Sequence, residues 1–197
     1  MLDTVAASEL KVVGKVSRRV DMVEKVTGQA TYVSDMVLPG MLYARVKTSP
    51  HARARIRSID VSAAEAMPGV RAVITGKDLK FKLGLYVEDK DILAREEVRH
   101  FGEAVAAVAA DTLETAKKAV DAITVDYEEL EPVLHPRDAV KEGAPLVHPD
   151  LGSYSYMKSA FTPVPGTNIA NHTKLRKGDV EKGFEEAEWI LEREYTN

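Results

Sequence analysis

The sequence contains no cysteine, and this absence removes several classes of site at once. A chain without thiols forms no disulfide, and it supplies neither a thiolate metal site nor the ligands of an iron–sulfur cluster. Any such group in a complex with this chain would have to be held by another polypeptide.

The sequence also lacks a basic excess and a long apolar run. Its formal net charge of -4 argues against a nucleic-acid-binding protein, which normally carries a clear positive excess. No apolar stretch approaches the roughly 20 residues that span a bilayer. Near the start, Asp3 and Glu9 bracket the short stretch Thr4 to Ser8, which does not match a secretory signal. We therefore expect a cytoplasmic protein with no nucleic-acid and no membrane partner.

Motifs for phosphate and metal binding are incomplete. A phosphate loop needs several glycines and a Ser or Thr after the lysine, and Gly14-Lys15 and Gly76-Lys77 have neither. His135, His148 and Asp150 are candidate metal ligands, but they stand in turns with no close histidine pair. We expect structural or solvent-exposed histidines there.

Motifs for acid–base and nucleophilic chemistry are equally weak. Ser49 and His51 lie two apart, so both point to one side of an extended chain, yet no oxyanion hole is evident. The acidic run Glu128 to Glu131 is typical of a solvated strand end. We therefore predict no catalytic, cofactor-binding or metal-binding residue in this chain.

What the sequence does contain is a β-α-β pattern in the stretch from Lys25 to Leu79. Small and apolar residues alternate with arginines over residues 52–58, as in a strand. Asp60 is positioned to cap a helix over residues 61–67, Pro68-Gly69 ends it, and Val70 to Ile74 form the next strand. The arginines on the outer face of the first strand could bind an anionic group or a partner chain, or could simply be solvated.

A second β-α-β pattern follows. The alanine- and valine-rich stretch from Ala104 to Ala110 predicts a buried strand, and Asp111 with Glu114 predicts a capping box. A strand over residues 123–127 comes next, and shorter strands are expected at 12–16, 42–47 and 98–101. The helix between the strands at 104–110 and 123–127 should bury one face, made of Leu113, Ala116, Val120 and Ile123. Together these elements predict an α+β fold with a mixed sheet and crossover helices.

After Pro132 the chain changes character. Prolines and glycines predict a turn-rich connection to about Pro165. Asp179 should cap a helix that contains Val180, Phe184 and Ala187 on one face, and Trp189 to Tyr195 alternate like a final strand. We expect an irregular C-terminal extension that ends in a helix plus a strand.

Eight short segments follow one another along nearly the whole chain. They are residues 28–35 (GQATYVSD), 38–44 (LPGMLYA), 49–53 (SPHAR), 67–78 (MPGVRAVITGKD), 98–110 (VRHFGEAVAAVAA), 125–132 (VDYEELEP), 177–184 (KGDVEKGF) and 192–195 (EREY). In this order they resemble the α/β-hammerhead domain that begins the molybdenum-binding subunit of the xanthine dehydrogenase and aldehyde oxidase family. The shared order makes the match strong, although each segment alone is weak.

The resemblance implies an N-terminal arm at residues 1–20, a hammerhead domain at 21–132, and at 133–197 a linker with the start of the next domain of the subunit. It implies a molybdenum–pterin cofactor for the complete subunit, with none bound by this chain. The implied partners are the remaining domains of the molybdenum-binding subunit, an iron–sulfur subunit and, where one is present, a flavin subunit with FAD. The expected role is structural, at the subunit interface of an oxidoreductase; the alternative is a standalone scaffold or binding module without redox activity. An interface role predicts exposed apolar side chains at Phe101, Phe184 and Trp189.

Overall fold

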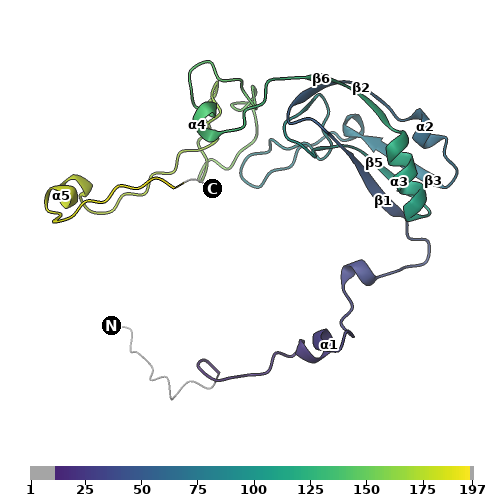
Figure 1. Cartoon of the computed structure of the whole chain (residues 1–197), viewed down its shortest axis with the longest axis horizontal. Coiled ribbons are helices and arrows are strands. Elements are labelled where there is room, and N and C mark those ends of the chain that lie inside the picture. Colours follow the sequence, from purple (N-terminus) through teal and green to yellow (C-terminus); the bar gives the residue numbers. More distant parts are fainter. Residues whose placement is uncertain (1–11, 196–197) are drawn as a thin grey trace. The chain divides into compact units, whose positions relative to one another are not determined.

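The computed structural model describes residues 12–195 (Figure 1). The chain divides into two units, Met1–Met41 and Leu42–Asn197. The described part of the first unit contains the helix α1 (Met22–Val26) and the 3-10 turn η2 (Val33–Asp35). The predicted strand at 12–16 is wrong. Residues 12–15 form a turn in which the Lys15 amide donates to the Val12 carbonyl at 3.2 Å, and Gly14 has a φ of 79°, outside the extended region.

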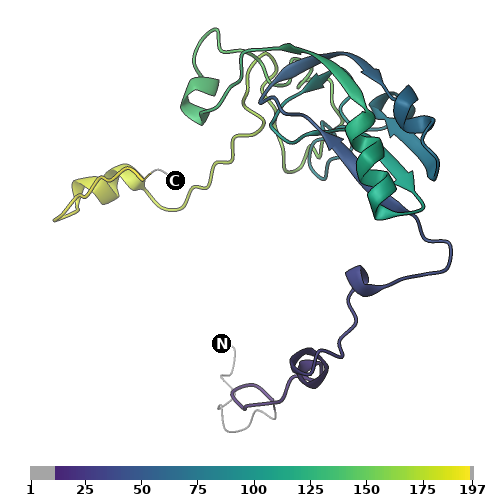
Figure 2. The same ribbon diagram turned by 45° about the vertical axis from the view of Figure 1, so that its right-hand side comes forward.

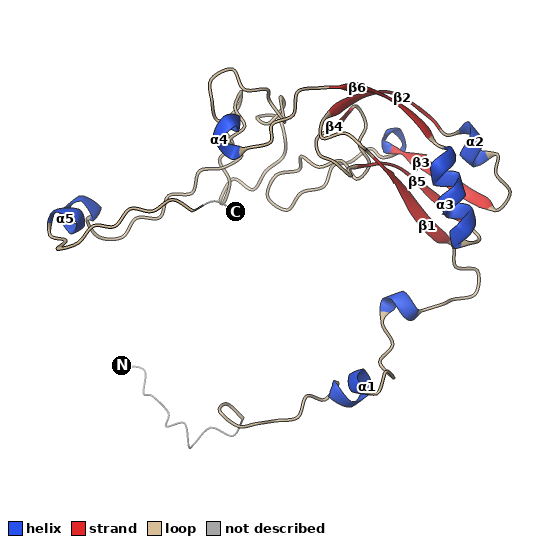
Figure 3. Cartoon of the chain, viewed as in Figure 1, coloured by secondary structure: helices blue, strands red, loops and turns tan. Residues whose placement is uncertain are grey.

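The second unit contains two three-stranded sheets, coloured red in Figure 3. One has the order β1-β5-β3 and the other the order β4-β2-β6. All four strand pairs described are antiparallel, so the prediction of a mixed sheet is wrong. The strands are β1 (Tyr43–Thr48), β2 (Ala54–Asp60), β3 (Val70–Thr75), β4 (Glu97–Val98), β5 (Ala104–Ala110) and β6 (Thr124–Glu129).

The crossover helices explain this difference. The helix α2 (Ser62–Glu65) joins β2 to β3, and α3 (Leu113–Ala122) joins β5 to β6. In both cases the two strands belong to different sheets. Each crossover therefore links the two sheets instead of placing parallel neighbours in one sheet.

The main core lies between α2, α3 and the β1-β5-β3 sheet (Figure 2). Ala116 and Ile123 are buried as predicted, but Leu113 is 37% exposed and Ala119 is buried instead. The buried face of α3 is thus made of small residues, which allow the helix to lie close to the sheet. The buried members of this cluster are Ala64, Ala106, Val108, Ala119 and Ile123, and a second cluster contains Ala54, Ala94, Val98 and Val105.

The helix caps agree with the sequence in part. Asp179 caps α5 (Val180–Glu185) as predicted, since its carboxylate accepts from the Lys182 amide at 3.1 Å. Asp60 accepts from the Ser62 amide at 3.0 Å, although Val61 occupies the N-cap position of α2. The capping box at Asp111 is wrong.

Thr112 caps α3 in its place, with its hydroxyl accepting from the Thr115 amide at 3.1 Å. Asp111 instead accepts two hydrogen bonds from the Arg71 guanidinium, both at 2.8 Å. The strand β3 brings Arg71 to this position, and no local pattern predicts it.

Beyond β6 the chain is mostly irregular, with the short helix α4 (Pro136–Ala139) before α5. The predicted final strand is wrong, because residues 189–195 have no strand hydrogen bonding. An alternating pattern forms a strand only where a sheet edge accepts its backbone groups. The predicted strand at 98–101 is reduced to the two residues of β4. Among helices over residues 12–195, none combines the length and hydropathy that crossing a bilayer requires.

Candidate functional site

The candidate site is the place where the segment 131–171 is attached to the two-sheet body. Arg53, the residue just before β2, makes two of these attachments and one bond within the body. Its Nε donates to Glu97 Oε1 at 2.8 Å, Nη1 to the Glu131 carbonyl at 3.1 Å, and Nη2 to the Leu146 carbonyl at 2.9 Å. The Arg53 and Glu97 side chains are only 11% and 18% exposed. One guanidinium therefore connects β2, β4 and two separate points of the later segment.

Arg99 makes a parallel attachment just after β4. Its Nε donates to the Val147 carbonyl at 3.0 Å, and its backbone amide donates to Glu103 Oε2 at 2.5 Å. Glu103 thus orders the turn before β5, and Arg99 extends from that turn to the later segment.

Asn168 adds a third set of hydrogen bonds, which lie within the segment 131–171 itself. We call this set, together with the bonds of Arg53 and Arg99, the framework. The Asn168 Oδ1 accepts from the Val147 amide at 2.8 Å, while Nδ2 donates to the Ala139 and Pro145 carbonyls, both at 3.0 Å. These three bonds close the stretch from Ala139, the last residue of α4, to Val147 into a loop, and residues 140–147 have no regular secondary structure. The loop is held by side chains that come from distant positions in the sequence.

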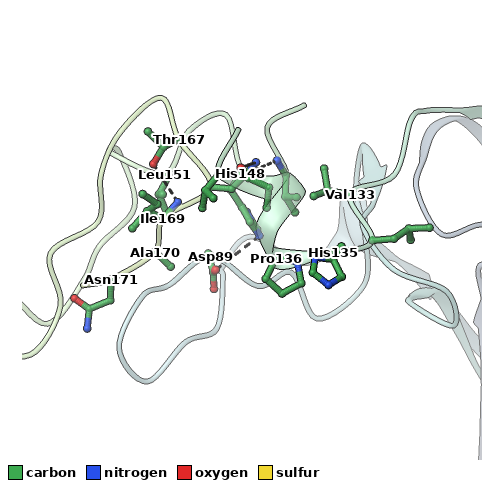
Figure 4. Close-up of a pocket in the computed structure, with 15 residues that line it drawn as sticks. Asp89, Val133, His135, Pro136, His148, Leu151, Thr167, Ile169, Ala170 and Asn171 are labelled. Atoms are coloured by element: carbon green, nitrogen blue, oxygen red, sulfur yellow. Dashed lines mark hydrogen bonds and ion pairs between the residues drawn. The ribbon is translucent and has the colours of Figure 1, made fainter. Parts of the chain in front are cut away.

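A cavity of about 670 Å³ lies within this framework (Figure 4). Its walls are largely apolar, and Asp89 and His148 are among its polar lining residues. The apolar lining includes Val133, Leu134, Pro136, Val140, Leu151 and Ile169. The cavity is large enough for a small ligand or for side chains of a docked polypeptide.

The surroundings of His148 in the cavity disfavour its protonated form. Burial, and next the charge of Arg99, lower the pKa of His148 below its ordinary value of 6.5. The nearby Asp89 carboxylate opposes this shift, but its Oδ2 lies 3.8 Å from His148 Nε2, beyond hydrogen-bonding distance. His148 Nδ1 lies 3.3 Å from the Tyr154 hydroxyl, whose pKa burial raises.

The outer face of β2 separates into two environments. Arg55 and Arg57 are exposed, and both contact Glu128 Oε2, at 2.9 and 3.2 Å. They fit the solvated alternative raised from the sequence. Arg53 does not, because its guanidinium is buried and its donors are occupied by the chain itself. The acidic run is likewise divided, since Glu128 and Glu129 belong to β6 and face these cations and His51.

Ser49 and His51 do not form a nucleophile–base pair. Ser49 is 1% exposed, and its Oγ accepts from the His51 backbone amide at 3.0 Å and donates to the His51 carbonyl at 3.3 Å. The His51 ring instead packs edge-on against Tyr127 and places Nδ1 3.2 Å from Glu129 Oε1. The serine hydroxyl therefore shapes a turn. The carboxylate beside His51 comes from strand register, and no sequence spacing could have identified it.

The other candidates have local structural partners. His135 caps α4, because its Nδ1 accepts from the Arg137 amide at 3.2 Å. Gly76 lies so close to the backbone that a Cβ would meet the Leu93 and Ala94 carbonyl oxygens at 2.5 Å, which explains the glycine without a phosphate. Over residues 12–195, no group of three His, Asp or Glu side chains is arranged to hold a metal ion.

Several large apolar side chains of the described residues are exposed. Phe101 is 74% exposed, Phe184 57% and Trp189 87%, as an interface role predicts. Leu175, Ile190, Leu191 and Tyr195 are also mostly exposed. The described groups thus offer attachment points and apolar surface, and they form no constellation of nucleophile, base and oxyanion donors.

The chain has relatives of known family. Residues 27–131 match the family model "Aldehyde oxidase and xanthine dehydrogenase, a/b hammerhead domain". The large molybdopterin subunit of nicotinate dehydrogenase from Eubacterium barkeri is 36% identical over 190 residues, which are 95% of this chain and 41% of that protein. A probable xanthine dehydrogenase subunit from Bacillus subtilis (strain 168) is 36% identical over 187 residues, 93% of this chain and 23% of the relative. The chain therefore spans less than half the length of these relatives.

Solved structures agree with the sequence matches. A Cu,Mo-CO dehydrogenase superposes with a TM-score of 0.66 at 39% identity, over 73% of this chain and 19% of the other. The aldehyde oxidoreductase of Desulfovibrio gigas gives a TM-score of 0.61 at 34% identity, over 66% of this chain and 16% of the other.

Proposed function

The chain belongs to the aldehyde oxidase and xanthine dehydrogenase family through its a/b hammerhead domain, and we propose that it is the N-terminal part, or a separately encoded piece, of the large subunit of a molybdenum hydroxylase. In this proposal residues 1–20 are an arm, 21–132 the hammerhead domain, and 133–197 a linker with the start of the next domain. The complete subunit would work in the cytoplasm.

The role that we propose for this chain is structural. The observation that carries it is the pair Arg53 and Arg99, which fix the segment 131–147 to the two-sheet body, while large apolar side chains beyond that segment stay exposed. An ordered attachment followed by uncovered aromatic residues is what a domain needs in order to present its continuation to a larger body. The remaining domains of the large subunit would bury these side chains.

The described residues that line the cavity do not fit a molybdenum–pterin group. The Asn168 amide makes three hydrogen bonds to the chain, and the Asn171 amide nitrogen donates to the Ala160 carbonyl at 3.3 Å. With no arginine or lysine in its lining, the cavity offers few donors for a pterin ring or a phosphate. We assign the molybdenum cofactor to the rest of the large subunit, and iron–sulfur and flavin groups to partner subunits.

A standalone scaffold is the second candidate. It requires the segment from Phe184 to Tyr195 to pack on the chain's own sheets, and the exposure of Trp189 and Tyr195, 87% and 88%, disfavours it.

A native pull-down tests the proposal. The tagged chain is purified from its own cells, co-purifying polypeptides are identified by mass, and molybdenum and iron are assayed. We expect near-stoichiometric molybdenum together with larger partners. A metal-free chain without partners would overturn the oxidoreductase assignment and leave the scaffold.

A further inference from the structure

The β1-β5-β3 sheet carries its polar and apolar residues on unexpected faces. Cross-strand partners point to the same side of a sheet. The rows Arg45–Val108–Val73 and Lys47–Ala106–Thr75 therefore lie on the side of α3, where Val108 and Ala106 are buried in the core. The cations of β1 thus lie on the side that is covered.

The opposite side of this sheet is apolar. We call it the open face, and it consists of the rows Ala44–Ala109–Ala72 and Val46–Ala107–Ile74. Val46 is 45% exposed and Ile74 39%, and even Ala107 and Ala109 of the central strand are partly exposed. No residue of the two rows is charged or polar.

This pattern is the reverse of that of a solvated sheet. In an antiparallel sheet with one covered face, the uncovered face normally alternates to polar residues. Here the alternation puts alanine, valine and isoleucine on the uncovered side. Four alanines also make the surface shallow, so a neighbouring backbone could approach closely.

The size of the open face indicates which occupant it fits. With strands about 4.8 Å apart and a rise of about 3.4 Å per residue, two rows across three strands cover roughly 200 Å². A stable interface between free proteins buries about 800 Å² on each partner. The open face alone is therefore too small to hold two copies of the chain together, whereas a tethered or multiply attached polypeptide can use a small patch.

We infer that the open face is the docking site for an apolar helix or strand from the remainder of the large subunit. This inference rests on the proposed function, which supplies the longer polypeptide. It adds a second contact region, made of residues other than Phe101, Phe184 and Trp189. The occupant should be uncharged where it meets the two rows, since an unpaired charge buried there would be costly.

The test is capture of the polypeptide that completes the large subunit in the same genome. That polypeptide is co-expressed with the tagged chain, and the captured amount is quantified by mass. Ile74→Glu places a carboxylate on the open face, and we expect capture to fall by about tenfold or more because that carboxylate would be buried unpaired. Ala52→Glu, at an exposed position outside the sheets, and Ile74→Val should both capture like the wild type.

The folded state of each variant is checked by thermal unfolding of the isolated chain. Ile74 is 39% exposed, so Ile74→Glu should unfold near the wild-type temperature; if it does not, Val46→Ser replaces it in the assay. Equal capture by the wild type and Ile74→Glu would overturn the docking site and leave the proposed function standing. If the wild-type chain captured no polypeptide, both the docking site and the proposed function would be overturned. A dimer in light scattering that Ile74→Glu abolishes would show a second copy as the occupant and overturn the inference.

Discussion

The two-sheet body at residues 42–131 and the segment 132–195 are held in place by different forces. In the body, strand ladders satisfy the backbone, and alanine, valine and isoleucine side chains fill the core. In the segment, backbone carbonyls are satisfied by distant side chains such as Arg53, Arg99 and Asn168. The body is stabilised by many small apolar contacts. The segment is attached by these side-chain bonds and by backbone bonds between residues 86–88 and 155–157, so each side-chain bond should matter locally.

The largest effect is expected from the core of the body. Ile123→Ala removes a side chain that is 2% exposed between α3 and the β1-β5-β3 sheet. We expect the free energy of unfolding to fall by about 2–5 kcal/mol, since the variant loses apolar burial and leaves a cavity. Chemical denaturation measures the change.

The matched control for this variant is Leu113→Ala on the same helix, where the side chain is 37% exposed. Leu113→Ala should lower the free energy of unfolding clearly less than Ile123→Ala does. Equal losses for the two variants would mean that the buried face of α3 is not the one described.

The attachment of the segment is tested by Arg53→Ala. The variant loses three hydrogen bonds from a guanidinium and leaves Glu97 without its partner. A hydrogen bond to a charged group typically contributes about 1.5–3 kcal/mol to stability. We expect limited proteolysis between residues 132 and 165 to become about tenfold faster, which corresponds to ~1.4 kcal/mol of local stability.

Arg55→Ala is the control, because Arg55 is 57% exposed and pairs with Glu128 on the surface. It should change proteolysis little, as exposed ion pairs contribute about 0–1 kcal/mol. If Arg53→Ala left the cutting rate unchanged, the segment would have to be held by something other than this framework.

Paired glycine variants compare the packing of the two regions. Gly76→Ala forces a Cβ to within 2.5 Å of two carbonyl oxygens in the body, and overpacking of this kind costs about 1–3 kcal/mol. Gly183→Ala, in α5, has no atom within 4 Å of the added Cβ. It should be neutral or slightly stabilising, because alanine favours a helix over glycine. Thermal unfolding of both variants gives the comparison.

The smallest expected effect is the dependence of the segment's stability on pH through His148. Burial lowers the pKa of His148 below 6.5, so the unfolded chain binds more protons than the folded chain just below that pH. The stability that neutral His148 contributes is therefore complete above pH 6.5 and is lost as the pH falls toward the depressed pKa. Protection of the segment against hydrogen exchange should weaken from pH 7 toward pH 5.5. His148→Gln should remove that part of the dependence; an unchanged pH profile would contradict the role of this ring.

The sequence predicted local elements better than their assembly. The strands predicted at 42–47 and 52–58 follow from period-two alternation, and those at 70–74 and 104–110 from apolar composition with Gly69 and Gly102 at the turns. They correspond to β1, β2, β3 and β5. The helix after Ala110 follows from its period, and Ala116 and Ile123 are buried as predicted, but Leu113 is exposed and the cap is Thr112 instead of Asp111. The mixed sheet was wrong because periodicity does not say which sheet a strand joins. The strand at 189–195 was wrong because alternation does not supply a pairing edge.

The candidate site was the least predictable part. Arg53 appears in the sequence as one of three alternating arginines, and nothing local separates it from Arg55 or Arg57. Only the fold brings the carbonyls of Glu131 and Leu146 to its guanidinium. The exposure of Phe101, Phe184 and Trp189, by contrast, was predicted from the family resemblance and is confirmed.

By itself, the sequence determined the family, most of the strands and the helix α3, because order of motifs, periodicity and turn residues act over short distances along the chain. The tertiary structure alone decided the division into two antiparallel sheets, the attachment of the segment through Arg53, Arg99 and Asn168, and the apolar open face of the β1-β5-β3 sheet. These features depend on which residues meet across long sequence separations. Register and packing set those meetings, and no local pattern encodes them.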